Sequence, residues 1–72
     1  MKSKVFIRVF EAEKSSVQNI ARLSTEALVG YYLSMYPGDP ISALLVDMQN
    51  NIVPITAGTR VKKILEVIIK EK

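Results

Sequence analysis

Three cationic residues follow a short loop of small and hydroxylated residues late in the sequence. Arg60, Lys62 and Lys63 come directly after Thr56-Ala57-Gly58-Thr59. We expect the last helix to begin at Thr59 and to run to about residue 71, which puts these cations in its first turn. The helix dipole disfavours positive charge there, whereas backbone N–H groups, hydroxyls and cations together bind phosphate or carboxylate. The pattern predicts an anion site made of Gly58, Thr59, Arg60, Lys62 and Lys63.

A purely structural interpretation of this cluster stays open. Lys62 and Glu66 lie four residues apart in the expected helix, and such a pair is favourable on a helix surface. Long lysine side chains also cover apolar surface without binding anything. In this interpretation the segment is a solvated basic turn, and Arg60 and Lys63 remain as the cations without a partner.

The sequence has few of the groups that enzymes use. It contains no His and no Cys, so the commonest general base, the best nucleophile and the usual zinc and haem ligands are missing. Its three glycines are isolated and form neither a Walker loop nor a dinucleotide fingerprint. Asp47, the one carboxylate inside an apolar run, is interpreted as a turn residue that hydrogen-bonds the backbone. We expect a non-enzymatic protein without cofactor or metal.

The chain that must position these residues is short and has no disulfide bond to stabilise it. Its 72 residues predict a single domain over residues 1–72, close to the lower size limit for independent folding. Hydrophobic residues make up 49% of the chain, and without disulfides this much apolar material favours burial against another chain. We therefore expect a two-fold homodimer. The formal net charge of +3 permits nucleic acid or another anionic partner.

Residues 4–10 are rich in β-branched and aromatic types, as is typical of a strand. A period of two places the valines and the isoleucine on a core face. The opposite face carries two aromatic and two cationic side chains, which could meet a partner or a phosphate backbone. Its members are Lys4, Phe6, Arg8 and Phe10.

A long helix is expected from about residue 16 to 35. Ser15 and Gln18 have the spacing of a capping box, and apolar residues then recur at helical spacing. Three tyrosines near its end, Tyr31, Tyr32 and Tyr36, form an aromatic patch. We interpret this patch as core or subunit interface, with stacking on nucleic-acid bases as the alternative.

Residues 41–55 fit two structures. As a helix, Asp39 would be the N-cap and Pro40 the first helical residue, with an apolar stripe from Ile41 to Met48. As a hairpin, residues 43–46 and 52–55 would pair across a Gln49-Asn50-Asn51 turn that tolerates positive φ. We favour the hairpin narrowly. The chain is then an α+β domain of order β-α-β-β-α, with a small sheet covered by two helices.

Two segments resemble known families. The charged first strand and the Leu23-Ser24-Thr25-Glu26 break resemble a ribbon-helix-helix DNA-binding protein. That resemblance implies a strand followed by helices, dimers made by pairing first strands, and DNA read by residues 4, 6, 8 and 10. No glycine separates the helices here, which departs from the family pattern.

The second resemblance concerns residues 45–56. Leu45-Val46-Asp47, Ile52-Val53 and Thr56 are similar to one half of a CBS repeat. This similarity implies a nucleotide site. The acidic residue that the family places three positions after the threonine is replaced by Thr59.

The leading functional prediction is a non-enzymatic, homodimeric, nucleic-acid-associated or regulatory module. The alternatives are a protein-interaction or assembly module without nucleic-acid binding, and a small-anion sensor at Gly58. No apolar segment approaches the ~20 residues that span a bilayer, and no signal-peptide pattern follows Met1. We expect a cytoplasmic protein without a membrane partner.

Overall fold

The computed structural model describes the backbone of residues 2–70 and the side chains of residues 4–70, and it is entirely helical there. Its elements are α1 (Lys2–Lys14), the short 3-10 helix η1 (Ile20–Arg22), α2 (Thr25–Met35), α3 (Pro40–Gln49) and α4 (Ile55–Lys70). The expected α+β order, with its sheet and its hairpin, is therefore wrong. The ribbon-helix-helix-like alternative fails for the same reason, because its first strand is α1.

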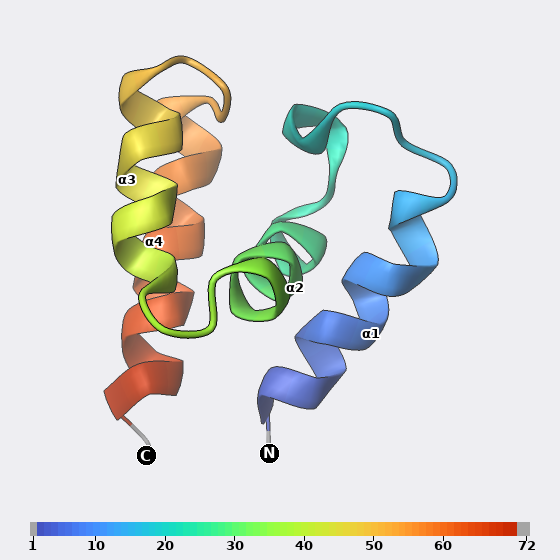
Figure 1. The fold of residues 1–72 in the computed structure, drawn as a ribbon, viewed down its shortest axis with the longest axis horizontal. Helices are drawn as coiled ribbons and strands as arrows, with labels where there is room; N and C mark the ends of the chain where they lie inside the picture. The colour runs from blue at the N-terminus through green and yellow to red at the C-terminus, as the bar shows by residue number, and fades with distance from the viewer. Residues whose placement is uncertain (1, 71–72) are drawn as a thin grey trace.

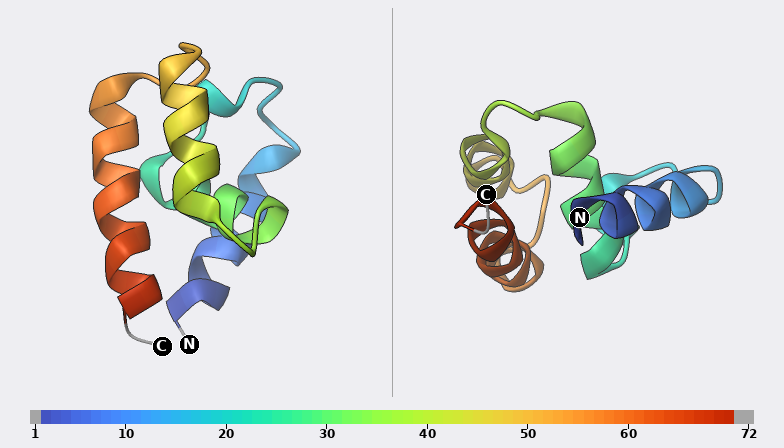
Figure 2. Two further views of the ribbon diagram at one scale, coloured as in Figure 1. Left: turned by 60° about the vertical axis from the view of Figure 1, so that its left-hand side comes forward. Right: turned by 90° about the horizontal axis from the view of Figure 1, so that it is seen from below.

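Helix α2 lies at the centre of the fold. It packs against α1 on one side and against α3 and α4 on the other, and α3 and α4 run antiparallel against each other (Figures 1 and 2). The core gathers around α2, and its fully buried large side chains include Leu28, Val29, Leu44 and Leu65. The start of α1 and the end of α4 lie at the same end of the molecule (Figure 1).

Residues 4–10 form a helix because their apolar residues also fit a helical period. Phe6, Val9 and Phe10 stand at i, i+3 and i+4, and all three pack in or against the core, whereas Val5 is 61% exposed. A helix satisfies its backbone hydrogen bonds internally. A strand here would need a neighbouring strand, and the described residues contain none.

The backbones of α1 and α2 approach each other closely at Gly30. A Cβ atom placed on Gly30 would lie 1.9 Å from the carbonyl oxygen of Phe6 and 2.9 Å from the Cα of Ile7. Only a residue without a side chain fits at this crossing.

The expected helix over residues 16–35 is wrong in its first half. The Ser15–Gln18 capping box does not form, since the Ser15 hydroxyl donates to the carbonyl of Ala12 over 3.3 Å. Helix α2 begins nine residues later, where the Ser24 hydroxyl accepts a hydrogen bond from the Ala27 N–H over 3.2 Å. The observed N-cap is thus Ser24, a residue type that favours this position.

The hairpin expected over residues 41–55 is replaced by α3 and the loop after it. Asp39 is the N-cap of α3 and accepts from the Ser42 N–H over 3.2 Å, and Pro40 is the first helical residue. The helix ends at Gln49 with Asn50 as its C-cap, and the next residue, Asn51, has a φ of 61°. The N–H groups of Asn51 and Ile52 donate to the carbonyls of Met48 and Asp47 over 3.2 and 2.9 Å, which is a Schellman C-cap. The asparagine turn exists, but it joins two helices.

Helix α4 begins one turn earlier than the sequence indicated. The Gly58 N–H donates to the Pro54 carbonyl over 2.8 Å, and the Thr59 hydroxyl donates to the Ile55 carbonyl over 2.8 Å. Thr59 is therefore inside the helix and is not its cap. Val61, Leu65 and Ile68 are buried and form the core-facing side of α4.

Candidate anion-binding groove

An open groove runs between the start of α2 and the outer side of α4. It consists of two adjoining hollows of about 480 and 300 Å³ that share Thr25 and Arg60. We call it the α2–α4 groove. Its lining residues are Thr25, Glu26, Thr56, Ala57, Arg60, Lys63 and Ile64.

In the groove, two cationic side chains of α4 lie beside the N-terminus of α2. Arg60 and Lys63 lie at i and i+3 on α4, so they share one face, and both side chains are exposed. The first turn of α2 leaves backbone N–H groups without an intrahelical acceptor, and the Ser24 hydroxyl satisfies the one on Ala27. The positive end of the α2 dipole therefore faces the same space as the two cations, while Glu26 contributes one opposing negative charge.

Glu13 holds the start of α2 in place. One of its carboxylate oxygens accepts from the Ser24 N–H over 3.0 Å and the other from the Ser24 hydroxyl over 2.6 Å. These hydrogen bonds, first that from the hydroxyl and then that from the N–H, lower the pKa of the Glu13 carboxyl. A residue of α1 thus completes the cap that positions one wall of the groove.

The expected anion site is only partly assembled. Arg60 and Lys63 meet in the groove, but Lys62 forms an ion pair with Glu66 over 3.5 Å on another face of α4, as its i, i+4 spacing indicated. Gly58 is buried, and a Cβ there would lie 2.5 Å from the sulfur of Met48. Gly58 and Thr59 are therefore ordinary helical residues, and the three cations do not occupy the first turn.

The groove also contains residues that sequence reasoning did not assign. Thr25 and Glu26 precede Arg60 by more than thirty positions, so no local pattern joins them. The sequence signal for a helix start at this point is the Ser24-Thr25-Glu26 segment, because serine is a favourable N-cap residue.

Lys4 and Arg8 lie far from the groove. Both are exposed on α1 and are four residues apart. Helix α1 lies on the opposite side of α2 from α4 (Figure 1), so these two cations form a separate basic surface.

The expected interface aromatics lie mostly inside the chain. Phe10 and Tyr32 are buried, whereas Tyr36 is 42% exposed. Tyr31 stands edge-on to Phe10 and Tyr32, with ring centroids 5.5 and 4.8 Å apart. Phe6 is half-buried. Most of this patch therefore joins α1 to α2 within one chain.

The Tyr32 hydroxyl donates a hydrogen bond to a carboxylate oxygen of Asp47 over 2.7 Å. Asp47 lies in α3, and its side chain bonds this phenol, which corrects its interpretation as a turn residue. Burial, followed by the contact with Asp47, raises the pKa of Tyr32 well above its usual value. Burial also raises the pKa of Tyr31, with smaller contributions from Tyr36 and Asp47.

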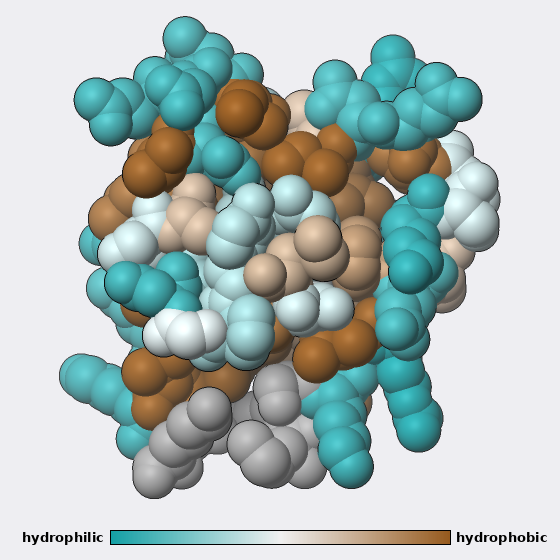
Figure 3. Space-filling model, in the orientation of Figure 1, coloured by the Kyte–Doolittle hydropathy of each residue, from teal (hydrophilic) through white to brown (hydrophobic). Residues whose placement is uncertain are grey.

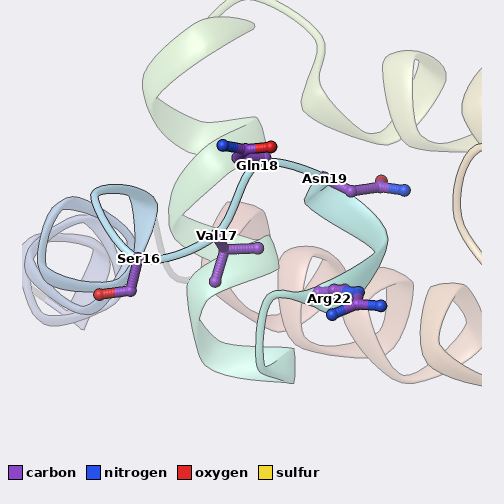
Figure 4. Close-up of a pocket in the computed structure, with 5 residues that line it drawn as sticks. All are labelled: Ser16, Val17, Gln18, Asn19 and Arg22. Carbon is purple, nitrogen blue, oxygen red and sulfur yellow. The ribbon is translucent and has the colours of Figure 1, made fainter.

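A larger hollow lies in the loop between α1 and α2, but it gathers no set of functional groups. It has a volume of about 750 Å³ and is lined by Ser16, Val17, Gln18, Asn19 and Arg22 (Figure 4). The side chains do not converge: Ser16 points away from Asn19 and Arg22 (Figure 4). The Asn19 oxygen already accepts from the Ala21 N–H over 3.0 Å. The α2–α4 groove remains the better candidate site.

Comparisons with known proteins assign neither a family nor a function to this chain. Comparisons with protein-family models, curated proteins and solved structures give no match to this chain. Within residues 2–70, no helix has the length and apolar character to cross a membrane. The described side chains contain no group of three or more metal-binding residues.

Proposed function

We propose that this protein is a non-enzymatic binding module that holds phosphate groups of a nucleic-acid backbone in the α2–α4 groove. The proposal rests on one observation: Arg60, Lys63, Thr25 and Thr56 line one groove at the N-terminal end of α2. Cations, hydroxyls and a helix N-terminus are the groups that proteins direct at phosphate oxygens. The lack of His and Cys in the sequence supports a binding role over catalysis.

The shape of the groove favours a nucleic-acid chain over a small anion. It is open to solvent along α4, whereas pockets for small molecules enclose most of the ligand surface. The net charge of +3 also attracts a polyanion over a distance. No aromatic residue lines the groove, so we expect backbone contacts with little sequence preference.

A fluorescence-anisotropy titration with short labelled single-stranded and duplex oligonucleotides tests the proposal. We expect binding at low salt that weakens as salt rises. The double variant Arg60→Ala/Lys63→Ala should bind at least tenfold more weakly, and the slope of log K against log salt should fall by about 2.

Lys62→Ala is the matched control because it removes an α4 lysine whose partner is Glu66 on another face. It should leave affinity within about twofold, since Lys62 does not line the groove. No binding at low salt, or an equal loss in Lys62→Ala and the double variant, would contradict a role for the groove.

We also propose a cytoplasmic location, where nucleic acid is accessible. The absence of Cys from the sequence is compatible with a reducing compartment. Cell fractionation with an antibody against the chain checks this, and recovery in a membrane or exported fraction would contradict it.

A further inference from the structure

We propose that this protein joins two separate segments of nucleic acid, one held in the α2–α4 groove and one on the outer side of α1. This inference rests on the proposed function of the groove and adds a second surface for the same class of partner. We call that surface the α1 basic surface. It consists of Lys4 and Arg8, which are both exposed on α1.

Lys4 and Arg8 form a pair along one line of the helix. They stand four residues apart, so they share a face of α1 and lie about 6 Å apart along its axis. Duplex DNA carries one negative charge per about 1.7 Å of its axis, so such a pair contacts more than one phosphate. Among the described side chains the only ion pair joins Lys62 to Glu66, so neither cation is held by a carboxylate.

Helix α1 itself adds positive potential at this surface. Lys4 lies in the first turn of α1, where the helix dipole is positive, and that turn contains no acidic residue. Glu11, exposed one turn after Arg8, contributes one opposing charge. The carboxylate of Glu13 is instead engaged by two hydrogen bonds from Ser24. Hydrophilic side chains follow the outer edge of α1 in Figure 3, which keeps the orientation of Figure 1. The α1 basic surface is therefore complementary to a polyanion.

The α1 basic surface and the groove belong to opposite sides of the molecule. Helices α1 and α4 flank α2 in both directions of view (Figures 1 and 2), and the Cα atoms span 30 × 26 × 19 Å. Duplex DNA is straight over such a length, because its persistence length is about 150 base pairs. A short duplex seated against Arg60 and Lys63 therefore does not curve around α2 to reach Lys4 and Arg8. The two surfaces contact different segments.

The width of the protein limits the repulsion between two bound segments. Helix α2 alone separates them by about 10 Å, which already exceeds the Debye length of about 8 Å at physiological ionic strength. The net charge of +3 between them offsets part of the remaining repulsion. We expect the groove to fill first, because it adds two hydroxyls and the N-terminus of α2 to its two cations. The α1 basic surface then takes the second segment.

Energy transfer between two labelled duplexes tests the proposal. Duplexes of about 12 base pairs, about 40 Å long, carry either a donor or an acceptor dye and are mixed at low salt with the full chain. The wild type should produce energy transfer that disappears as salt rises. Lys4→Ala/Arg8→Ala should lose most of the transfer, yet its affinity for a single duplex, measured by anisotropy, should stay within about threefold because the groove contacts remain. Retained affinity also shows that this variant is folded.

The matched control is Lys14→Ala/Lys62→Ala, which removes the same two positive charges from other places. Lys14 lies over the ring of Phe10, 5.6 Å from its centroid, and Lys62 pairs with Glu66. This variant should join duplexes like the wild type, and an equal loss in it would reduce the effect to net charge and overturn the proposal.

Two further outcomes separate this inference from the function of the groove. A wild type that binds a single duplex but gives no energy transfer would overturn the joining of two segments and leave the groove as a binding site. Transfer by Lys4→Ala/Arg8→Ala equal to that of the wild type would do the same, since two grooves of a protein dimer would then hold the duplexes. Absence of any duplex binding at low salt would instead contradict the groove itself.

Discussion

The phenol of Tyr32 and the carboxylate of Asp47 form a hydrogen bond of 2.7 Å that joins α2 to α3. Tyr32 is fully buried in the core, and Asp47 is half-buried at its edge. Without this bond, the phenol oxygen would be a buried polar group without a partner, which is costly. The pair therefore fixes which face of α3 meets α2.

Replacing Tyr32 with Phe should destabilise the protein by ~1.5–3 kcal/mol, because it removes a hydrogen bond to a charged group and leaves the ring in place. Urea unfolding followed by circular dichroism measures this loss. Tyr36→Phe is the control, since Tyr36 is 42% exposed. Equal effects of the two substitutions would contradict a special role for Tyr32.

Alkaline pH should destabilise the wild type through the same tyrosine. Its pKa is raised in the folded state above the ordinary value of 10.0, so the unfolded chain loses this proton first. The stabilisation is complete below pH 10 and declines as pH rises above it. Unfolding midpoints at several alkaline pH values should therefore fall more steeply for the wild type than for Tyr32→Phe. Parallel curves would show that Tyr32 ionises normally.

Glu13→Gln should reduce stability at neutral pH and remove part of the acid dependence. The pKa of Glu13 is lowered from 4.5 in the folded state, so its contribution is present above that value and is lost as pH falls through the folded pKa. Glutamine can still accept from Ser24, but through a weaker neutral hydrogen bond. Acid titrations of wild type and variant should converge at low pH. Glu11→Gln, on an exposed position of the same helix, should follow the wild type throughout.

Gly30→Ala should destabilise the fold by about 2 kcal/mol or more, because the new Cβ would overlap the backbone of Phe6 and force α1 away from α2. This cost exceeds the gain of about 1 kcal/mol in helix propensity. Gly38→Ala is the control, since nothing lies within 4 Å of its Cβ position. Chemical denaturation should show that variant equal to or slightly more stable than the wild type, and a tolerated Gly30→Ala would contradict the close helix crossing.

The first helix shows why the fold class could not be read from local sequence. Residues 4–10 satisfy both a period of two and a helical spacing through Phe6, Val9 and Phe10. β-Propensity mostly reports fit to a half-buried surface, so a helix packed on α2 can override it. Whether residues 4–10 form a strand or a helix is decided by the presence of another strand to pair with, and that depends on the rest of the chain.

Residues 40–49 show a different limitation. The Asp39 cap and the Pro40 start can be read from the sequence, and the structure contains both. Of the apolar stripe predicted for the helix, Ile41, Leu44 and Met48 lie in or against the core, whereas Leu45 is 43% exposed. The predicted hairpin requires a strand over residues 52–55 that pairs with residues 43–46. That strand does not exist, since Pro54 precedes α4 and its carbonyl accepts the Gly58 N–H. The wrong strand over residues 52–55 therefore led to the wrong hairpin over residues 41–55.

The candidate groove was predicted in part. The sequence singled out Arg60 and Lys63 because positive charge is unfavourable in the first turn of a helix. In the structure α4 starts earlier, and the helix N-terminus that lies beside these two cations is that of α2. Thr25 and Glu26 could not be placed beside them, because their proximity follows from the packing of α2 on α4. The pairing of Lys62 with Glu66 was predicted and is confirmed, since it depends only on helical spacing within one element.

The central position of α2 also bears on how quickly the chain reaches this structure. The pairs α1–α2, α2–α3 and α3–α4 are each made by consecutive helices, and α2–α4 skips only one. Short sequence separations keep the entropy lost on closing loops small, and helical proteins of this kind fold in about microseconds to milliseconds. Temperature-jump relaxation would therefore find a single fast phase, in which α2 acts as the common docking partner for α1 and for the α3–α4 hairpin.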